Sequence, residues 1–342
     1  MSGKAQQDQK LPLRLRLKAW WEGYDPHELK TRLDELGGPD EAPSPDHGAD
    51  AAPPDELAVR DQIPAEVAEG DLPFDPWDDR RAEVAQYIWG EGYCGPGGPE
   101  HIIAMSKLLA LSPEMSMLEI GAGLGGPART LAEHFGVWMT GYEESASLVE
   151  LANEKATMAG MGKKAEVHPF DPENVADFDR KFDRAFAKEA MFTVADKAQL
   201  ITRIEQHLKP GGLFLATDYV LGTDSVVGTE DYRKWKESER KRPAPVTADE
   251  LAELFKSAHL LVRVDEDVSD DYIAVISKAW AGADKVAARL SDQPDGAELI
   301  QALMREAELW AHRSRMLKDG NLRVWRILAA KKSDGPSMMS DW

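Results

Sequence analysis

The chain has 342 residues, of which 42% are hydrophobic, and its formal net charge at pH 7 is −20. This length suffices for one large domain with additions or for two domains, and the negative charge argues against DNA or RNA as the main partner, because nucleic-acid binding needs a basic surface. The single cysteine, Cys94, excludes an intramolecular disulfide and fits a reducing compartment. No uninterrupted apolar run reaches the roughly 18 residues of a membrane span. We therefore expect a cytoplasmic protein.

The N-terminal arm, residues 1–38, is basic and ends in a short helix. Leucines alternate with charged residues from Leu11 to Leu17, and aromatic residues follow up to Tyr24. Such a stretch can lie on an anionic membrane, which predicts peripheral contact at the inner membrane face through residues 10–24. The alternative is an arm that packs on the main domain or on a second subunit, as in a homodimer.

Composition divides the rest of the chain. Residues 39–79 are rich in proline and acidic residues, and we interpret them as a linker that is partly disordered. The main domain is predicted over residues 80–331, with a helical insertion at 270–320. Residues 332–342 are predicted to be a loose tail.

The main domain opens with two predicted helices, 81–89 and 99–111, joined by a glycine-dense loop. This loop, WGEGYCGPGG, holds Trp89 and Tyr93 among flexible residues just before the next motif. It is typical of a lid over a bound ligand. The alternative interpretation is a tight turn between helices.

A strand that breaks into glycines and restarts as a helix follows at residues 117–129, MLEIGAGLGGPAR. Glycine there allows positive φ and close approach of the backbone to a ligand, as in a nucleotide-binding turn. The spacing also satisfies the dinucleotide pattern G-x-G-x-x-G, so an NAD-dependent enzyme is one alternative. Glu119, however, is an acid inside a buried strand, which needs a positive or hydrogen-bonding partner. The pattern E-x-G-x-G-x-G resembles motif I of class I S-adenosylmethionine (SAM) methyltransferases.

Strands and helices alternate after this motif. Further strands are predicted at 137–142, 165–168, 184–187, 213–219, 260–264 and 322–330, and helices at 145–158, 195–208 and 248–258. This alternation predicts a parallel α/β sheet in which ligands gather at the carboxyl ends of the strands. Glu143 follows the second strand and stands where a ribose diol could donate hydrogen bonds to it.

From about residue 80 to residue 331 the chain resembles class I SAM-dependent methyltransferases of the phosphoethanolamine and sarcosine/glycine N-methyltransferase type. The loop WGEGYCGPGG is similar to that family's F-G-E-G-(Y/F)-x-S-x-G-G, and the segment LKPGG before LFLATDY matches its fifth-strand entry. The resemblance implies a Rossmann-like sheet, mostly parallel with the last strand antiparallel, a helical N-terminal extension and a C-terminal helical insertion.

The resemblance also implies SAM as the cofactor and assigns site residues. Glu119 would contact the amino group of the methionine end, Glu143 the ribose and Asp171 the adenine. The expected cofactor-binding residues are Cys94, Gly95, Glu119, Gly121, Ala122, Gly123, Glu143, Glu144, Asp171 and Lys188. Glu189 and Tyr219 are the candidates for assisting proton removal. No metal is expected, because the eight histidines show no metal-binding spacing.

Two positions depart from the family. Its tyrosine from the N-terminal helix and its histidine after the fourth strand correspond here to Trp77 and Thr193. The general base of the family is therefore missing at these positions. A basic segment from Arg233 to Arg242 could bind an anionic acceptor such as a phosphobase or a carboxylate, or could be a solvated helix face.

The expected function is transfer of a methyl group from SAM to a small-molecule or lipid-like acceptor by in-line displacement. One alternative is a catalytically silent SAM-binding protein that serves regulation or assembly. Another is a methyltransferase that modifies lipids at the membrane surface.

Overall fold

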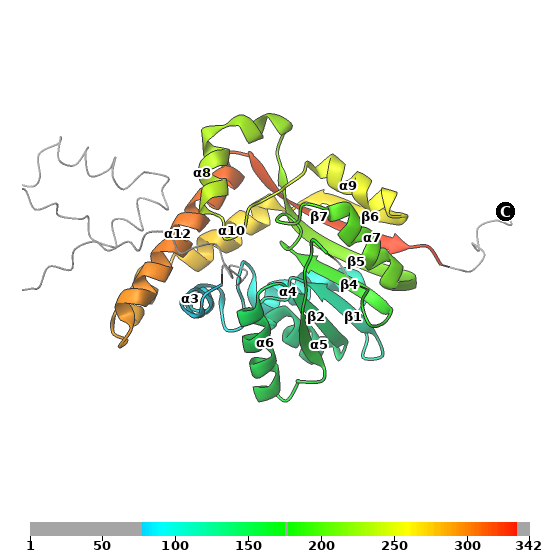
Figure 1. Ribbon diagram of the computed structural model, residues 1–342, viewed down its shortest axis with the longest axis horizontal. Helices are drawn as coiled ribbons and strands as arrows, with labels where there is room; N and C mark the ends of the chain where they lie inside the picture. Colours follow the sequence, from blue (N-terminus) through cyan, green and yellow to red (C-terminus); the bar gives the residue numbers. More distant parts are fainter. Residues whose placement is uncertain (1–76, 175–176, 334–342) are drawn as a thin grey trace, which may run out of the picture.

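The computed structural model describes residues 77–174 and 177–333. These residues form one seven-stranded sheet in the order β3-β2-β1-β4-β5-β7-β6, with helices on both faces (Figure 1). Its strands are β1 (Ser116–Ile120), β2 (Trp138–Glu143), β3 (Ala165–Pro169), β4 (Phe182–Lys188), β5 (Leu208–Leu221), β6 (Leu260–Asp267) and β7 (Leu322–Lys331). Pairs among β1 to β5 are parallel, and β7 is antiparallel to both of its neighbours. The predicted α/β sheet with an antiparallel last strand is confirmed.

Helices connect the strands. They are α3 (Asp79–Trp89), α4 (Gly98–Ser106), α5 (Gly126–Phe135), α6 (Ala146–Met158), α7 (Lys197–His207), α8 (Glu230–Ser238), α9 (Ala248–Ser257), α10 (Ser269–Trp280), α11 (Ala283–Ser291) and α12 (Gly296–Lys318). Ser145 caps α6 by accepting from Leu148 N, and Thr247 forms a capping box with Glu250 at the start of α9. These two predicted helix starts are thus confirmed.

The strands bury alternate residues on opposite faces. On one face, Met117 of β1 belongs to a core that includes α4, α5 and the insertion helices α10 and α12. On the other face, Leu118 and Ile120 pack in a second core with α7 and α9. Because side chains alternate along a strand, Glu119 lies on the same face as Met117.

The C-terminal insertion consists of three helices rather than one continuous helical stretch. Gly282 separates α10 from α11, and residues 292–295, which include Pro294, separate α11 from α12. Both are helix-breaking sequences. Helix α8, which sequence patterning did not predict, packs on α12.

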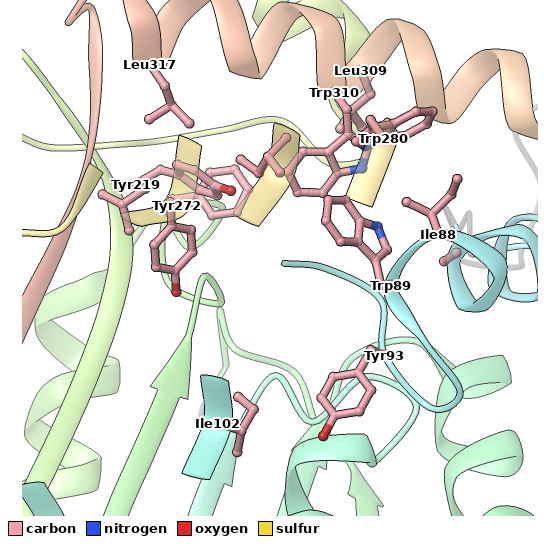
Figure 2. Close-up of a cluster of buried hydrophobic side chains, with 14 of the residues drawn as sticks. Ile88, Trp89, Tyr93, Ile102, Tyr219, Tyr272, Trp280, Leu309, Trp310 and Leu317 are labelled. Carbon is pink, nitrogen blue, oxygen red and sulfur yellow. The ribbon is translucent and has the colours of Figure 1, made fainter. Parts of the chain in front are cut away.

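An aromatic cluster joins the insertion to the start of the domain (Figure 2). Trp89 of α3 packs on Trp310 of α12 with ring centroids 4.6 Å apart, and on Trp280 of α10 edge to face at 6.5 Å. Such contacts between large buried rings contribute to core stability beyond their area. They fix the insertion above the end of the sheet where the cavity described below opens.

Several predictions fall on residues outside the described ranges. These are the arm 1–38 with its membrane contact at 10–24, nearly all of the linker 39–79 and most of the tail 332–342. Within residues 77–174 and 177–333, no helix is both long enough and apolar enough to cross a bilayer. The domain boundaries and the homodimer stay predictions.

Candidate active site

A cavity of about 570 Å³ lies at the carboxyl ends of β1, β2 and β4. Its walls come from the glycine turn after β1, the loop between α3 and α4, the segments after β2 and β4, the segment after α8, and α12. One end of this cavity, which we call the cofactor end, is formed around Glu119, the glycine turn and Glu143. The other part of its wall, which we call the acceptor end, is formed by residues 239–242, Trp310 and Arg313.

The glycine turn requires glycine at two positions for different reasons. Gly121 has φ +72°, and a Cβ there would lie 2.4 Å from the Cβ of Ala190, so the turn passes closely under the segment after β4. Gly126 donates from its backbone N to the carbonyl of Gly92 at 2.9 Å, and a Cβ there would lie 2.3 Å from the same oxygen. The turn therefore brings the loop between α3 and α4 against the start of α5.

Glu119 is the buried acid of the cofactor end. Its side chain lines the cavity and is 1% exposed, and its Oε2 atom has no hydrogen-bond partner among the described residues. Burial, followed by the nearby carboxylate of Glu143, raises the pKa of Glu119 to about 8. A buried carboxyl oxygen without a donor is costly, and a cationic ligand in the cavity would supply one.

Glu143 and Glu144 occupy the end of β2 and the turn after it. Glu143 Oε2 accepts from Gly123 N at 2.8 Å and Oε1 accepts from Ser145 N at 3.0 Å, while burial raises its pKa. Glu144 N is a third backbone donor to this carboxylate, which still keeps a lone pair that can accept from a ligand hydroxyl. Glu144 instead pairs with Lys241 at 2.8 Å, across the cavity.

The predicted adenine contact, Asp171, has a different position. Asp171 is exposed, does not line the cavity, and accepts from Glu173 N at 2.9 Å through its Oδ1. Its neighbours Phe170 and Pro172 line the cavity in its place. The Phe170 ring could contact an aromatic base in place of a carboxylate. The geometry of the site gives no support to the prediction for Asp171.

The loop between α3 and α4 is fastened to the domain. Tyr93 Oη and Thr130 Oγ1 share a hydrogen bond of 2.6 Å, and Gly92 N donates to Gln86 Oε1. Tyr93, Cys94 and Gly95 line the cavity, whereas Trp89 packs in the aromatic cluster. Burial raises the pKa of the Cys94 thiol to about 12, so the group remains a neutral thiol.

Arg313 is the buried cation of the acceptor end. Its Nε and Nη2 atoms donate to the two carboxylate oxygens of Glu239 at 2.6 and 2.5 Å. Its guanidinium lies over the rings of Trp310, Tyr219 and Phe192, at 4.7, 4.8 and 5.2 Å from their centroids. Burial opposes the charge, but Glu239 more than compensates, and the pKa of Arg313 is raised. The guanidinium is thus held rigidly, with N–H groups to spare.

Arg240 is held in the same manner by a second buried acid. Its Nε donates to Glu306 Oε1 at 3.2 Å and its Nη2 donates to Glu306 Oε2, while Arg81 Nε donates to Oε1 at 2.8 Å. Burial would raise the pKa of Glu306, but Arg240 and Arg81 outweigh it and lower the pKa. Arg240 also stacks on Trp77, 4.1 Å from its ring centroid. Arg242 lines the cavity without an ion-pair partner in the described part of the chain.

The rest of the predicted basic segment points elsewhere. Arg233 and Lys234 are exposed on α8 and pair with Glu230 and Glu237 of the same helix. The segment therefore divides into a solvated helix face and the cavity wall at residues 240–242. Trp77 and Thr193, which the motif resemblance aligns with a tyrosine and a histidine of the similar family, both line the cavity.

Glu189 and Lys188 lie where the two ends of the cavity meet. Lys188 Nζ donates to Glu189 Oε2 at 2.5 Å, and Thr217 Oγ1 and Tyr272 Oη donate to Glu189 Oε1 at 3.1 and 2.5 Å. Tyr219, the other predicted catalytic residue, does not line the cavity. It is buried behind the wall, where its ring supports the Arg313 guanidinium.

The remaining predicted site residues do gather on one cavity. Those that line it are Cys94, Gly95, Glu119, Gly121, Ala122, Gly123, Glu143, Glu144, Lys188 and Glu189. Sequence reasoning missed Arg313, Glu239, Phe170 and Tyr272. The one sequence signal for Arg313 was a cationic residue three positions after the apolar Trp310. No group of three or more histidine, cysteine or acidic side chains in residues 77–174 and 177–333 is placed to hold a metal ion.

Comparison with known proteins agrees with this architecture. Residues 100–263 match the family model described as a methyltransferase domain. The phosphoethanolamine N-methyltransferase of Plasmodium falciparum is 24% identical over 197 residues, which are 57% of this chain and 71% of that protein. Phosphoethanolamine N-methyltransferase 3 of Arabidopsis thaliana is 32% identical over 132 residues, which are 39% of this chain and 26% of that protein. The aligned part thus spans about a quarter of the Arabidopsis relative.

Solved structures share the fold. Phosphoethanolamine N-methyltransferase 2 of Haemonchus contortus, in complex with phosphomonomethylethanolamine and S-adenosylhomocysteine, superimposes with a TM-score of 0.66 at 20% identity, covering 74% of this chain and 57% of that one. A putative sarcosine dimethylglycine methyltransferase from Galdieria sulphuraria gives 0.61 at 17% identity, covering 75% and 98%. The resemblance inferred from the motifs is confirmed.

Proposed function

We propose that this chain, which carries a methyltransferase domain and has the class I methyltransferase fold, binds SAM and methylates a small acceptor that carries an amine and an anionic group. A phosphobase such as phosphoethanolamine is the first candidate, because the relatives are named for it. The observation that carries the proposal is the pairing of two arginines, Arg240 and Arg313, with buried carboxylates on the wall of the cavity that holds Glu119.

The residues at the cofactor end fit SAM. The unpartnered Oε2 of Glu119 would accept from the amino group of its methionine end, and the turn from Gly121 to Gly123 lines the same cavity. Glu143 would accept from the ribose hydroxyls, and Phe170 offers an apolar ring to the base. NAD carries a pyrophosphate, and two carboxylates at this end oppose such an anion.

The protein would contribute to methyl transfer mainly by orienting the acceptor. SAM supplies an activated methyl group on a sulfonium centre. The cavity must hold the acceptor nitrogen about 3 Å from that methyl with water excluded, an effect that can contribute several kcal/mol. Arg240 and Arg313 would bind the anionic group of the acceptor through N–H groups not used by Glu306 and Glu239, which fixes the distance of the amine from the methyl.

Proton removal falls to Glu189 in this proposal. Trp77 and Thr193 offer no base at the two positions where the family has one. Glu189 is the acid that lines the cavity between its two ends, with Lys188 as its ion-pair partner. An ammonium that enters would lie against this carboxylate and could pass its proton to it before the nitrogen attacks.

The test is a methyl-transfer assay with SAM and a panel of amines that differ in their anionic group. We expect turnover of phosphoethanolamine or of an amine with a carboxylate such as sarcosine, and none of ethanolamine. Arg240→Gln should raise KM for the accepted amine at least about tenfold, while the exposed Arg233→Gln leaves it unchanged. Turnover of ethanolamine as fast as of phosphoethanolamine would refute the anionic acceptor. SAM binding without turnover of any amine would favour the silent SAM-binding alternative.

A further inference from the structure

Tyr272 of α10 contacts Glu189, one of the residues that line the cavity, and no sequence motif indicated this contact. Figure 2 shows its side chain leaving the aromatic cluster, with the hydroxyl directed away from Trp89 and Trp310. The hydroxyl donates to Glu189 Oε1 at 2.5 Å and lies 3.2 Å from Thr217 Oγ1. Tyr272 is 1% exposed, so this contact is closed to solvent. The insertion therefore reaches the acid that we place at the reacting nitrogen.

The backbone of Glu189 is held in an unusual conformation. Its φ is +47°, a left-handed value that residues with side chains rarely adopt, and its N donates to the carbonyl of Thr217 at 2.7 Å. A residue in this conformation keeps it only if its surroundings fix it. Here both the backbone and the carboxylate are fixed, the latter by Tyr272, Thr217 and Lys188.

The donors leave one open acceptor position on the carboxylate. Oε1 accepts from both Tyr272 and Thr217, which uses its two lone pairs, and Oε2 accepts only from Lys188 among the residues that the structure describes. A proton from the acceptor can therefore be received at Oε2. Without Tyr272 the carboxylate could rotate, and this open position would no longer face a fixed direction.

We propose that Tyr272 is a positioning residue, which holds the Glu189 carboxylate so that Oε2 receives the acceptor proton, and which thereby couples the C-terminal insertion to methyl transfer. The inference rests on the proposed function. The proton passes from the acceptor ammonium to Oε2, and the nitrogen lone pair then forms the N–C bond while the C–S bond of the sulfonium breaks. The proton leaves Oε2 for water when the products depart, and Tyr272 keeps its own proton throughout.

Other ionisable groups surround this centre. His101 of α4 lies edge to face with Tyr272 at 5.5 Å, and Lys188 lies over the Tyr272 ring. Burial, followed by Lys188, lowers the pKa of His101, so it is neutral near pH 7. Asp218 and Tyr219 of β5 are also close enough to act on Glu189. The pH profile of a Tyr272 variant must therefore be compared with that of a matched variant.

The matched pair of variants is Tyr272→Phe and Tyr87→Phe. Tyr87 of α3 accepts a hydrogen bond from Gln293 at 2.9 Å, so its variant also removes one tyrosine hydrogen bond at the insertion without touching Glu189. We expect Tyr272→Phe to lower kcat at least about tenfold while the Kd of SAM stays within about twofold. The pH profile of kcat should also differ from that of the wild type, because the Glu189 carboxylate loses one of its hydrogen-bond donors. Tyr87→Phe should change none of these.

Equal effects of the two variants on kcat and on its pH profile would overturn the inference. A second readout needs no turnover. The ring-carbon NMR signal of Tyr272, assigned by its loss in Tyr272→Phe, should move in Glu189→Gln, while the signal of Tyr87 should not. An unmoved Tyr272 signal would overturn the contact itself. If the wild type turns over no acceptor, the proposed function fails, and the NMR result reports the contact separately.

Discussion

The two ends of the cavity hold their charges in opposite ways. At the cofactor end, Glu119 and Glu143 have no ion-pair partner among residues 77–174 and 177–333: Glu119 keeps an unpartnered oxygen, and Glu143 is held by backbone N–H groups. At the acceptor end Arg240 and Arg313 each have a buried carboxylate partner. The first arrangement leaves a carboxyl oxygen open to a cationic ligand, which would favour its ionised form. The second holds cations rigid and presents their free edges to an anion.

The largest expected effect is a loss of folding stability when a buried acid of the acceptor end is replaced. Glu306→Gln leaves Arg81 and Arg240 buried without a full counter-charge, and we expect a loss of about 3 kcal/mol in the free energy of unfolding. Chemical denaturation measures it. Glu298→Gln is the control, because Glu298 pairs with Arg80 at the exposed surface and should cost little. A loss under about 1 kcal/mol for Glu306→Gln would show that this cluster does not hold the wall.

Replacement of the buried acid of the cofactor end should instead weaken SAM binding. Glu119→Gln removes the charge that would meet the ammonium of SAM, so we expect its Kd to rise at least about tenfold. Asp171→Asn is the control and should leave the Kd unchanged, since Asp171 faces away from the cavity. Calorimetry measures both. The comparison between the two ends fails if the two variants weaken binding equally.

The pH dependence of SAM binding should show whether Glu119 at the cofactor end changes its protonation when the ligand binds. Free Glu119 has a pKa of about 8, well above that of an unfolded glutamate, so below pH 8 it carries a proton that SAM binding must displace. The association constant should then rise up to about tenfold per pH unit toward pH 8 and level off above it. In the absence of ligand, the pH dependence of folding stability has the opposite sign to that of SAM binding. The stabilisation of the folded state by protonated Glu119 is fully present below about pH 4.5 and is lost as the pH rises to 8.

The difference between the wild type and Glu119→Gln at each pH cancels the titration of the ligand itself. A parallel pH dependence in the two proteins would mean that Glu119 does not ionise on binding.

The smallest effect is expected at a partly exposed ion pair of the cavity wall. Lys241 and Glu144 form a partly exposed ion pair across the cavity. Lys241→Gln should change the acceptor KM by only about twofold, and added salt should reduce that difference. Steady-state kinetics at two salt concentrations measures it. A tenfold change that persists at high salt would place Lys241 on the acceptor.

These contrasts also explain what the sequence could predict. The cofactor end is nearly contiguous: Glu119, the glycines and Glu143 follow from one strand, one turn and the end of the next strand. The acceptor end pairs residues 66 and 74 positions apart, Arg240 with Glu306 and Arg313 with Glu239, and no local pattern reveals such partners. The fold and the cofactor turn were therefore predictable, whereas the acceptor wall required the packed insertion.

Two predicted residues show the limit of placing side chains by strand order. Asp171 follows the end of β3, but its carboxylate caps a turn instead of entering the cavity. Tyr219 lies in β5 on the correct face, yet Arg313 stands between it and the cavity. The hydroxyl that reaches Glu189 comes from Tyr272, in an insertion whose packing could not be inferred from periodicity.

The most direct test of the central claim is calorimetric titration of the wild type with SAM, S-adenosylhomocysteine and NAD in parallel. The account predicts micromolar binding of the first two and none of NAD, because Glu119 and Glu143 favour a cationic ligand and oppose a pyrophosphate. Binding of NAD, or no binding of any of the three, would contradict it.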